Sequence, residues 1–195
     1  ATRQGHVLGL FLEDTKRRLQ TRLKALGVAP EGLELVTLWP RADAGGLEAL
    51  DEYLARTPTA LVVIDTWAKF RPPRQPGADV YEADYLRAAA LKDLADKHGT
   101  TVLLLHHTRK AESPDFLATV SGSHGLTGAA DSVLVLARTR CQADATLYIT
   151  GRDVEETSMA LALQDGRWTY LGTADEYATT AERRAVLDFL KDSPA

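Results

Sequence analysis

Acidic and histidine residues follow several apolar runs of this chain. Asp65 directly follows the uninterrupted aliphatic run 61–64. Such a run is typical of a buried parallel strand, and open α/β sheets bind ligands at the carboxyl ends of these strands. If the ligand is a nucleotide, a carboxylate there can hold the water shell of Mg²⁺, which prefers hard oxygen ligands and sheds water reluctantly. The alternative is that Asp65 only ends a strand and caps the following turn.

Two other groups lie at comparable positions. Glu13 closes the apolar run 7–12, and with Asp14 it precedes a predicted helix, so capping of a positively polarised helix N-terminus is one interpretation of both acids. His106 and His107 follow a fourth apolar run. Neighbouring strand residues point to opposite faces, so this pair cannot readily chelate one metal ion, and His106 is interpreted as a core residue.

The elements that would position these residues alternate between apolar runs and helical periodicity. This alternation predicts an α/β fold with a mostly parallel sheet flanked by helices, followed by antiparallel strands. The predicted strands are 7–12, 33–38, 61–65, 101–106 and 131–137, the predicted helices are 15–26, 47–56 and 80–98, and the predicted antiparallel strands are 146–150, 159–163 and 168–171.

Two segments are predicted as loops. Residues 71–77 are too rich in proline for regular structure, and residues 109–127 form a long Ser- and Gly-rich stretch of the kind that is usually functional or mobile. Ser123 and His124 in the second loop raise the alternative of a hydrolase. Adjacent residues rarely form a nucleophile and base pair, and the chain has no G-x-S-x-G motif.

Composition indicates an ordinary globular protein. The chain has 195 residues, of which 45% are hydrophobic and 26% charged. No apolar stretch reaches membrane-spanning length, no signal peptide is recognised, and the single Cys141 cannot form an internal disulfide, so a cytoplasmic location is expected. The net charge of −4 encodes no general attraction to nucleic acid, so any such contact must be local. Arg109 and Lys110 are the candidates, with solvated surface as the alternative.

Six short motifs stand at element ends in a fixed order. They are Leu12-Glu13-Asp14, Ile64-Asp65-Thr66, Leu105-His106-His107-Thr108, Ser121-Gly122-Ser123, Ala129-Ala130-Asp131 and Gly151-Arg152-Asp153. In this order the chain resembles, over roughly residues 5 to 175, the RecA-like ATPase core of hexameric helicases. The closest resemblance is to the RepA-type replicative helicases of plasmids and phages, which are often grouped with AAA-family ATPases. The predicted domains are this core, 1–175, and a C-terminal helix, 176–195, similar to the start of a winged-helix module.

The resemblance implies a role for each site residue. Glu13 resembles the glutamate that orients the attacking water, and Asp65 the Walker B aspartate, with Thr66 beside it as a supporting hydroxyl. His107 corresponds to the residue that senses the terminal phosphate. Arg152 resembles an arginine finger offered to a neighbouring subunit, although the family's preceding lysine is Thr150 here. The alternative for Arg152 is a surface salt bridge with Asp153 or Glu155.

The same resemblance implies the cofactors and partners. ATP and Mg²⁺ would bind at subunit interfaces of a homo-oligomeric ring. The loop after His107 would line the channel, with Arg109 and Lys110 on the phosphates of single-stranded DNA. A catalytically inactive RecA-like module for assembly or DNA docking is the alternative function.

One expected motif is missing. Phosphate binding in this superfamily depends on G-x-x-x-x-G-K-[ST], whose backbone N–H groups and lysine cradle the phosphates, yet no lysine of this chain directly follows a glycine. Either the chain is a fragment of a protein that carries this loop upstream of Val7, or the protein has lost nucleotide binding. The fragment interpretation is preferred because Glu13, Asp65, His107 and Arg152 have little reason to persist together in an inactive scaffold. It predicts exposed apolar sheet surface, so the isolated chain should self-associate, recruit a partner or be marginally stable.

Overall fold

The computed structural model describes residues 4–27, 30–73, 80–108, 116–120, 124–138 and 144–178, together with 180 and 183. The chain divides into two compact units, residues 1–130 and 131–195. Each unit contains one four-stranded sheet. Of the predicted helix 180–191, residues 180 and 183 are helical and the others lie outside the described residues, as do residues 109–115 and 121–123 of the predicted loop.

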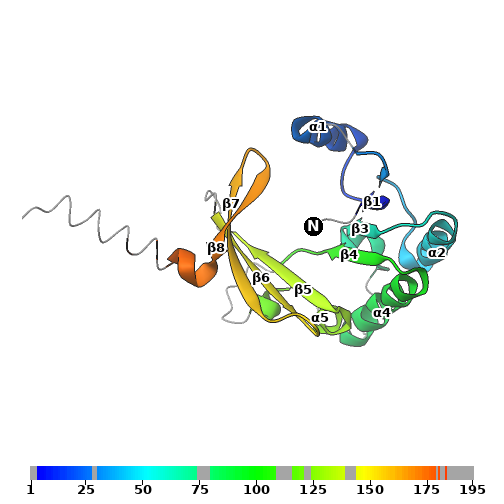
Figure 1. The fold of residues 1–195 in the computed structure, drawn as a ribbon. Coiled ribbons are helices and arrows are strands. Elements are labelled where there is room, and N and C mark those ends of the chain that lie inside the picture. Colours follow the sequence, from blue (N-terminus) through cyan, green and yellow to red (C-terminus); the bar gives the residue numbers. More distant parts are fainter. Residues whose placement is uncertain are drawn as a thin grey trace, which may run out of the picture. The chain divides into compact units, whose positions relative to one another are not determined.

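The sheet of the first unit is entirely parallel. It contains β1 (Val7–Phe11), β2 (Leu33–Val36), β3 (Leu61–Asp65) and β4 (Thr101–Leu105), in the spatial order β2-β1-β3-β4 (Figure 1). The predicted parallel sheet is therefore confirmed, with each strand within two residues of its expected end. Because β1 and β3 are neighbours, their carboxyl ends lie at the same edge of the sheet.

Helices connect these strands. Those expected from periodicity are α1 (Lys16–Leu26), α2 (Leu47–Arg56) and α4 (Val80–His98). Four shorter elements were not predicted, because their residues show no periodic pattern: η1 (Ala42–Gly46), α3 (Trp67–Phe70), η2 (Phe116–Thr119) and α5 (His124–Ala129). A four-residue helix such as α3 is too short to show a helical repeat, and it forms because Trp67 and Phe70 are both buried.

The core of the first unit lies on one face of its sheet, where α2 and α4 pack (Figure 1). Side chains alternate along a strand, so Leu8 and Leu10 of β1 and Val62 and Ile64 of β3 share this face, and all four are fully buried. Along β4 the alternation leaves the opposite face open. Leu103 and Leu105 remain 43% and 37% exposed.

The second unit is an antiparallel sheet. It contains β5 (Ser132–Ala137), β6 (Asp144–Gly151), β7 (Thr157–Gln164) and β8 (Arg167–Thr173), paired in chain order. The predicted antiparallel strands are thus confirmed. The turn between β7 and β8 has positive φ at Asp165 (50°) and Gly166 (77°), as expected for an Asp-Gly hairpin turn. The strand predicted at 131–137 is β5, and it joins this sheet rather than the parallel one.

One face of the second sheet is apolar across its strands. Directly opposed residues point to the same side of a sheet, so Leu134 and Leu136 of β5 share a face with Ile149 and Leu147 of β6. Leu134 is 53% exposed and Leu136 is 42% exposed. Each of the two sheets therefore has an apolar strand surface that its own described residues leave open.

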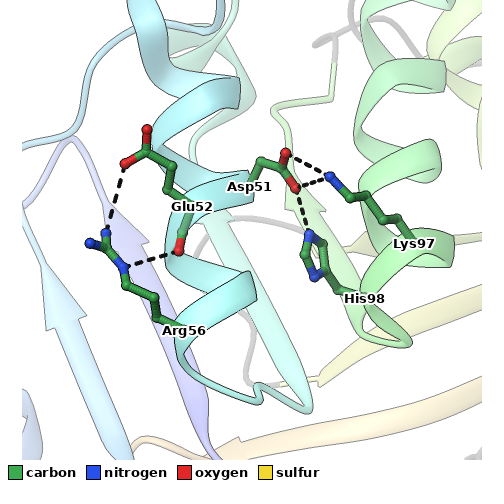
Figure 2. A network of polar contacts seen from close by, with 5 residues as sticks. All are labelled: Asp51, Glu52, Arg56, Lys97 and His98. Carbon is green, nitrogen blue, oxygen red and sulfur yellow. Dashed lines mark hydrogen bonds and ion pairs between the residues drawn. The ribbon is translucent and has the colours of Figure 1, made fainter.

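A polar network joins α4 to α2 (Figure 2). The Asp51 carboxylate accepts hydrogen bonds from Lys97 Nζ at 2.7 Å to each oxygen, and its Oδ1 lies 2.6 Å from His98 Nε2. The hydrogen bonds from Lys97 and then His98 lower the pKa of Asp51 below its ordinary value of 3.8. Glu52 and Arg56, also drawn, form a looser pair at 3.9 Å with both side chains 74% exposed.

We expect Asp51→Asn to lower the unfolding temperature modestly at neutral pH. A depressed pKa stabilises the folded chain above pH 3.8, and this contribution is lost as the pH falls through the lowered value. Thermal melts of Asp51→Asn and wild type should therefore differ at neutral pH and converge in acid. Glu52→Gln is the matched control, because an exposed pair contributes little. An Asp51→Asn melt that matches the wild type at pH 7 would contradict this prediction.

Candidate functional site

Two predicted site acids meet at the carboxyl edge of the parallel sheet. Asp65 ends β3 and pairs in register with Phe11, the last residue of β1. The Leu12 N–H donates to the Asp65 carbonyl, so the chain is still held against β3 just before Glu13. The parallel register therefore brings Glu13 and Asp65 together, although they are far apart in the sequence.

The Glu13 carboxylate accepts a hydrogen bond at one oxygen and has a histidine near the other. Thr66 Oγ1 donates to Glu13 Oε1 at 3.1 Å, and His107 Nε2 lies 3.9 Å from Glu13 Oε2. Thr66 is only 4% exposed, whereas the Glu13 side chain is 41% exposed. A buried hydroxyl thus orients a carboxylate that solvent and a ligand can reach. His107, with a side chain 74% exposed, closes the group from the end of β4.

Helix capping does not account for Glu13. The N-cap of α1 is Thr15, whose side chain accepts a hydrogen bond from the Arg18 N–H. The carboxylate of Glu13 instead faces Thr66 and His107. Thr66 was predicted as a supporting hydroxyl for the metal-side acid, and the structure places it on Glu13.

Three carboxylates, those of Glu13, Asp14 and Asp65, interact at this edge of the sheet. Partial burial raises the pKa of Asp65 above 3.8, and the neighbouring Asp14 and Glu13 raise it further. Arg22 and His107 act in the opposite direction. A carboxylate in such surroundings gains from a cation or a hydrogen-bond donor, so the edge is suited to bind a positively charged group.

The residues present fit a magnesium ion held together with a nucleotide. Among the described residues, no group of three or more His, Cys, Asp and Glu side chains could hold a metal alone. Mg²⁺ is commonly bound through one or two carboxylates, several waters and the phosphates of a substrate. Asp65, which combines a strand-end position with the raised pKa described above, provides such a carboxylate.

Sequence reasoning missed a second group at this edge. The side chain of Asp14 is 8% exposed, and its two oxygens contact Arg18 Nε at 3.2 Å and Arg22 at 2.6 Å. Part of the signal was present in the sequence, since Arg18 and Arg22 are four positions apart on one side of the predicted helix and Asp14 directly precedes it.

Arg152 lies in the second unit, directly after β6. The Arg152 guanidinium is 3.6 Å from Asp131 Oδ1, and the backbone N–H of Arg152 donates to the Asp131 carbonyl at 2.9 Å. The alternative for Arg152 was a surface salt bridge with Asp153 or Glu155, and the structure shows one with Asp131 across the β5–β6 pair. Both side chains are more than half exposed, so this ion pair can exchange for another anion.

Several sequence candidates lie outside the described residues. These are Arg109 and Lys110, predicted to contact nucleic acid, and Ser123 of the hydrolase alternative. His106 is half-buried and engages in an interaction within the fold. No described helix is long and apolar enough to cross a membrane.

Comparison with known proteins agrees with this architecture. A family model described as "AAA domain" matches residues 1–113, which include β1 to β4 and the acidic edge. No curated protein matches the chain.

Three solved structures are similar in fold. The "ATPase Domain of G40P" has a TM-score of 0.67 at 15% identity, over 85% of this chain and 74% of that one. The RadB recombinase has a TM-score of 0.57 at 15% identity, over 84% and 78%. The third structure is titled "The Structure Of A DnaB-Like Replicative Helicase And Its Interactions With Primase". It has a TM-score of 0.66 at 14% identity, over 85% of this chain and 52% of that one. The fold is therefore that of RecA-like ATPase domains, and the chain spans about half of the DnaB-like helicase.

Proposed function

Because the chain belongs to the AAA domain family, we propose that it is the nucleoside-triphosphate-hydrolysing core of a RecA-like motor, of the RepA-like replicative helicase type. The observation that carries this proposal is the meeting of Glu13 and Asp65 at the ends of adjacent parallel strands, with Thr66 bonded to Glu13. Phosphoryl transfer to water uses a residue that positions the attacking water and a carboxylate on the metal side, and these two acids can supply both.

Each residue has a defined task in this proposal. Glu13 accepts a proton from the attacking water, and Thr66 keeps its carboxylate in one orientation. His107, beside Glu13, contacts the terminal phosphate and responds to its loss. Asp65 holds the water shell of Mg²⁺. When bound, this ion neutralises charge on the phosphate oxygens.

The proposal extends to a ring of identical subunits on single-stranded DNA. Arg152 would exchange Asp131 for the nucleotide of a neighbouring subunit and offset the charge that develops on its phosphoryl oxygens. Arg109 and Lys110 would contact the phosphates of the DNA strand. The family, the fold and the exposure of Arg152 support this arrangement.

We further propose that residues encoded upstream of Ala1 supply the phosphate-binding loop and its strand. Leu103 and Leu105 support this, because they are exposed on β4, the last strand in the order of the parallel sheet. A helix packed on this face of the sheet would cover such a surface. The test is to bind fluorescent ATP and Mg²⁺ to the protein as its gene encodes it. Turnover supports a motor, binding without turnover supports an inactive module, and absence of binding contradicts both the loop and the motor.

The 195-residue chain alone is expected to self-associate through its open apolar strands. Replacing Leu103 and Leu105 with threonine should shift the light-scattering mass toward the monomer, since threonine keeps the strand and removes apolar surface. Leu38→Thr is the control, because Leu38 is 84% exposed and lies outside the strands. A wild-type chain that is monomeric over the same concentrations would contradict the fragment interpretation.

A further inference from the structure

Asp14 carries a buried charge directly beside the proposed base. Its side chain is 8% exposed, and a carboxylate is buried at a large cost unless it is paired and hydrogen-bonded. Both partners come from α1: Arg18 lies 3.2 Å from one oxygen and Arg22 lies 2.6 Å from the other. The two arginine side chains are themselves more than half exposed. The two ion pairs of Asp14 therefore attach α1 to the residue that follows Glu13.

The same ion pairs restrain the turn that contains Glu13, because Asp14 is the last residue of this turn. The Asp14 N–H donates to the Phe11 carbonyl at 3.3 Å, so a tight turn joins the end of β1 to Asp14, and Glu13 lies inside it. Apolar packing contributes little to the position of α1, in which Leu19 is the buried residue. The ion pairs of Asp14 therefore set the position of α1 relative to the turn.

The same group also acts on the charge of the edge. Asp14 raises the pKa of Asp65, while Arg22 lowers it, so both lie within electrostatic reach of the second site acid. Loss of Arg22 would remove the closer of the two cations that hold the buried Asp14 carboxylate in place.

We propose that Asp14 and Arg22 are positioning residues for hydrolysis, which clamp the Glu13 turn to α1 so that the Glu13 carboxylate stays in line with the attacking water. This inference rests on the proposed function and adds to it a group that touches neither water nor nucleotide. A base displaced by a fraction of its hydrogen-bond length loses much of its effect, so the clamp acts on the rate of the chemical step rather than on nucleotide affinity.

The test compares single-turnover ATP hydrolysis and fluorescent-nucleotide affinity in the protein as its gene encodes it. Arg22→Ala should lower the hydrolysis rate about tenfold and change the affinity less than about twofold, and Arg22→Lys should recover part of the rate. Arg17→Ala is the matched control, since it removes an exposed arginine from the same helix. Asp14→Asn combined with Arg22→Ala should cost no more than Asp14→Asn alone, because the two residues act as one unit.

The outcomes separate this inference from the proposed function. If Glu13→Gln abolishes turnover while Arg22→Ala behaves like Arg17→Ala, the positioning role of Asp14 and Arg22 is contradicted and the proposed hydrolysis function is supported. A lower affinity with an unchanged rate for Arg22→Ala would also overturn the clamp. If Glu13→Gln leaves turnover unchanged, the proposed function itself fails. A merely structural role would lower the unfolding temperature of Arg22→Ala without changing the rate well below that temperature, and this result would overturn the inference too.

Discussion

Glu13→Gln is expected to lower ATP turnover by about 10²- to 10⁴-fold, which is the usual contribution of a positioned general base. The substitution preserves the shape of the side chain and leaves an amide oxygen that can still accept the hydrogen bond from Thr66. It removes the group that takes the proton from water. Nucleotide affinity should therefore change little, and the bound nucleotide should persist as the triphosphate.

The measurement is steady-state phosphate release with Mg²⁺, alongside equilibrium binding of fluorescent ATP, on the protein as its gene encodes it. Glu31→Gln is the control, because Glu31 is an exposed acid outside the helices and strands. Equal loss of binding and turnover in Glu13→Gln would mean that Glu13 positions nucleotide rather than water. Unchanged turnover would remove Glu13 from the chemistry altogether.

Asp65→Asn is expected to produce two opposite effects. Turnover that depends on Mg²⁺ should fall at least about a hundredfold, because the amide cannot hold the water shell of the ion as a carboxylate does. The ligand-free chain should become more resistant to heat at neutral pH. Loss of function together with a gain in stability is the pattern expected of a residue kept for chemistry.

The gain in stability follows from the raised pKa of Asp65, which has burial as its first cause and Asp14 and Glu13 as the next. A raised carboxyl pKa means that the folded chain binds the proton more tightly than the unfolded chain. Asp65 therefore favours folding below pH 3.8, and this advantage disappears as the pH rises through the raised value, which leaves a net cost at neutral pH.

Thermal melts as a function of pH test the stability effect without any nucleotide. The wild type should lose stability relative to Asp65→Asn as the pH rises from below 3.8 toward neutrality. Asp93→Asn, at an exposed position of α4, controls for the general effect of removing a carboxylate. A melting temperature at pH 7 that is lower for Asp65→Asn than for the wild type would contradict the assignment of Asp65 as a strained acid.

The fold could be predicted from the sequence wherever a pattern repeats over enough residues. The helix at 80–98 is 19 residues long and was predicted with both ends correct, as was the strand at 61–65. The short helix α3 was not predicted, because its four residues complete only about one turn. Helix α5 was missed because it lies in a Ser- and Gly-rich segment that indicates a loop, and it forms there with Leu126 and Ala129 in the core.

The part of the candidate site that lies at strand ends could be predicted, because the strand ends themselves could be predicted. Parallel strands end at one edge, which is why Glu13 and Asp65 could be expected to meet. Sequence neighbours are a poor guide to partners across a sheet, however. Arg152 pairs with Asp131 because the antiparallel register of β5 and β6 brings residues 131 and 152 together, and no local pattern reveals that register.

A crystal structure of the protein as its gene encodes it, soaked with Mn²⁺ and a non-hydrolysable ATP analogue, tests the central claim most directly. The anomalous signal of Mn²⁺ should lie one water shell from the Asp65 carboxylate, with the terminal phosphate between Glu13 and His107. A metal and nucleotide bound away from the ends of β1 and β3 would contradict the account. So would a well-ordered nucleotide at this edge whose terminal phosphate is beyond the reach of a water held by Glu13.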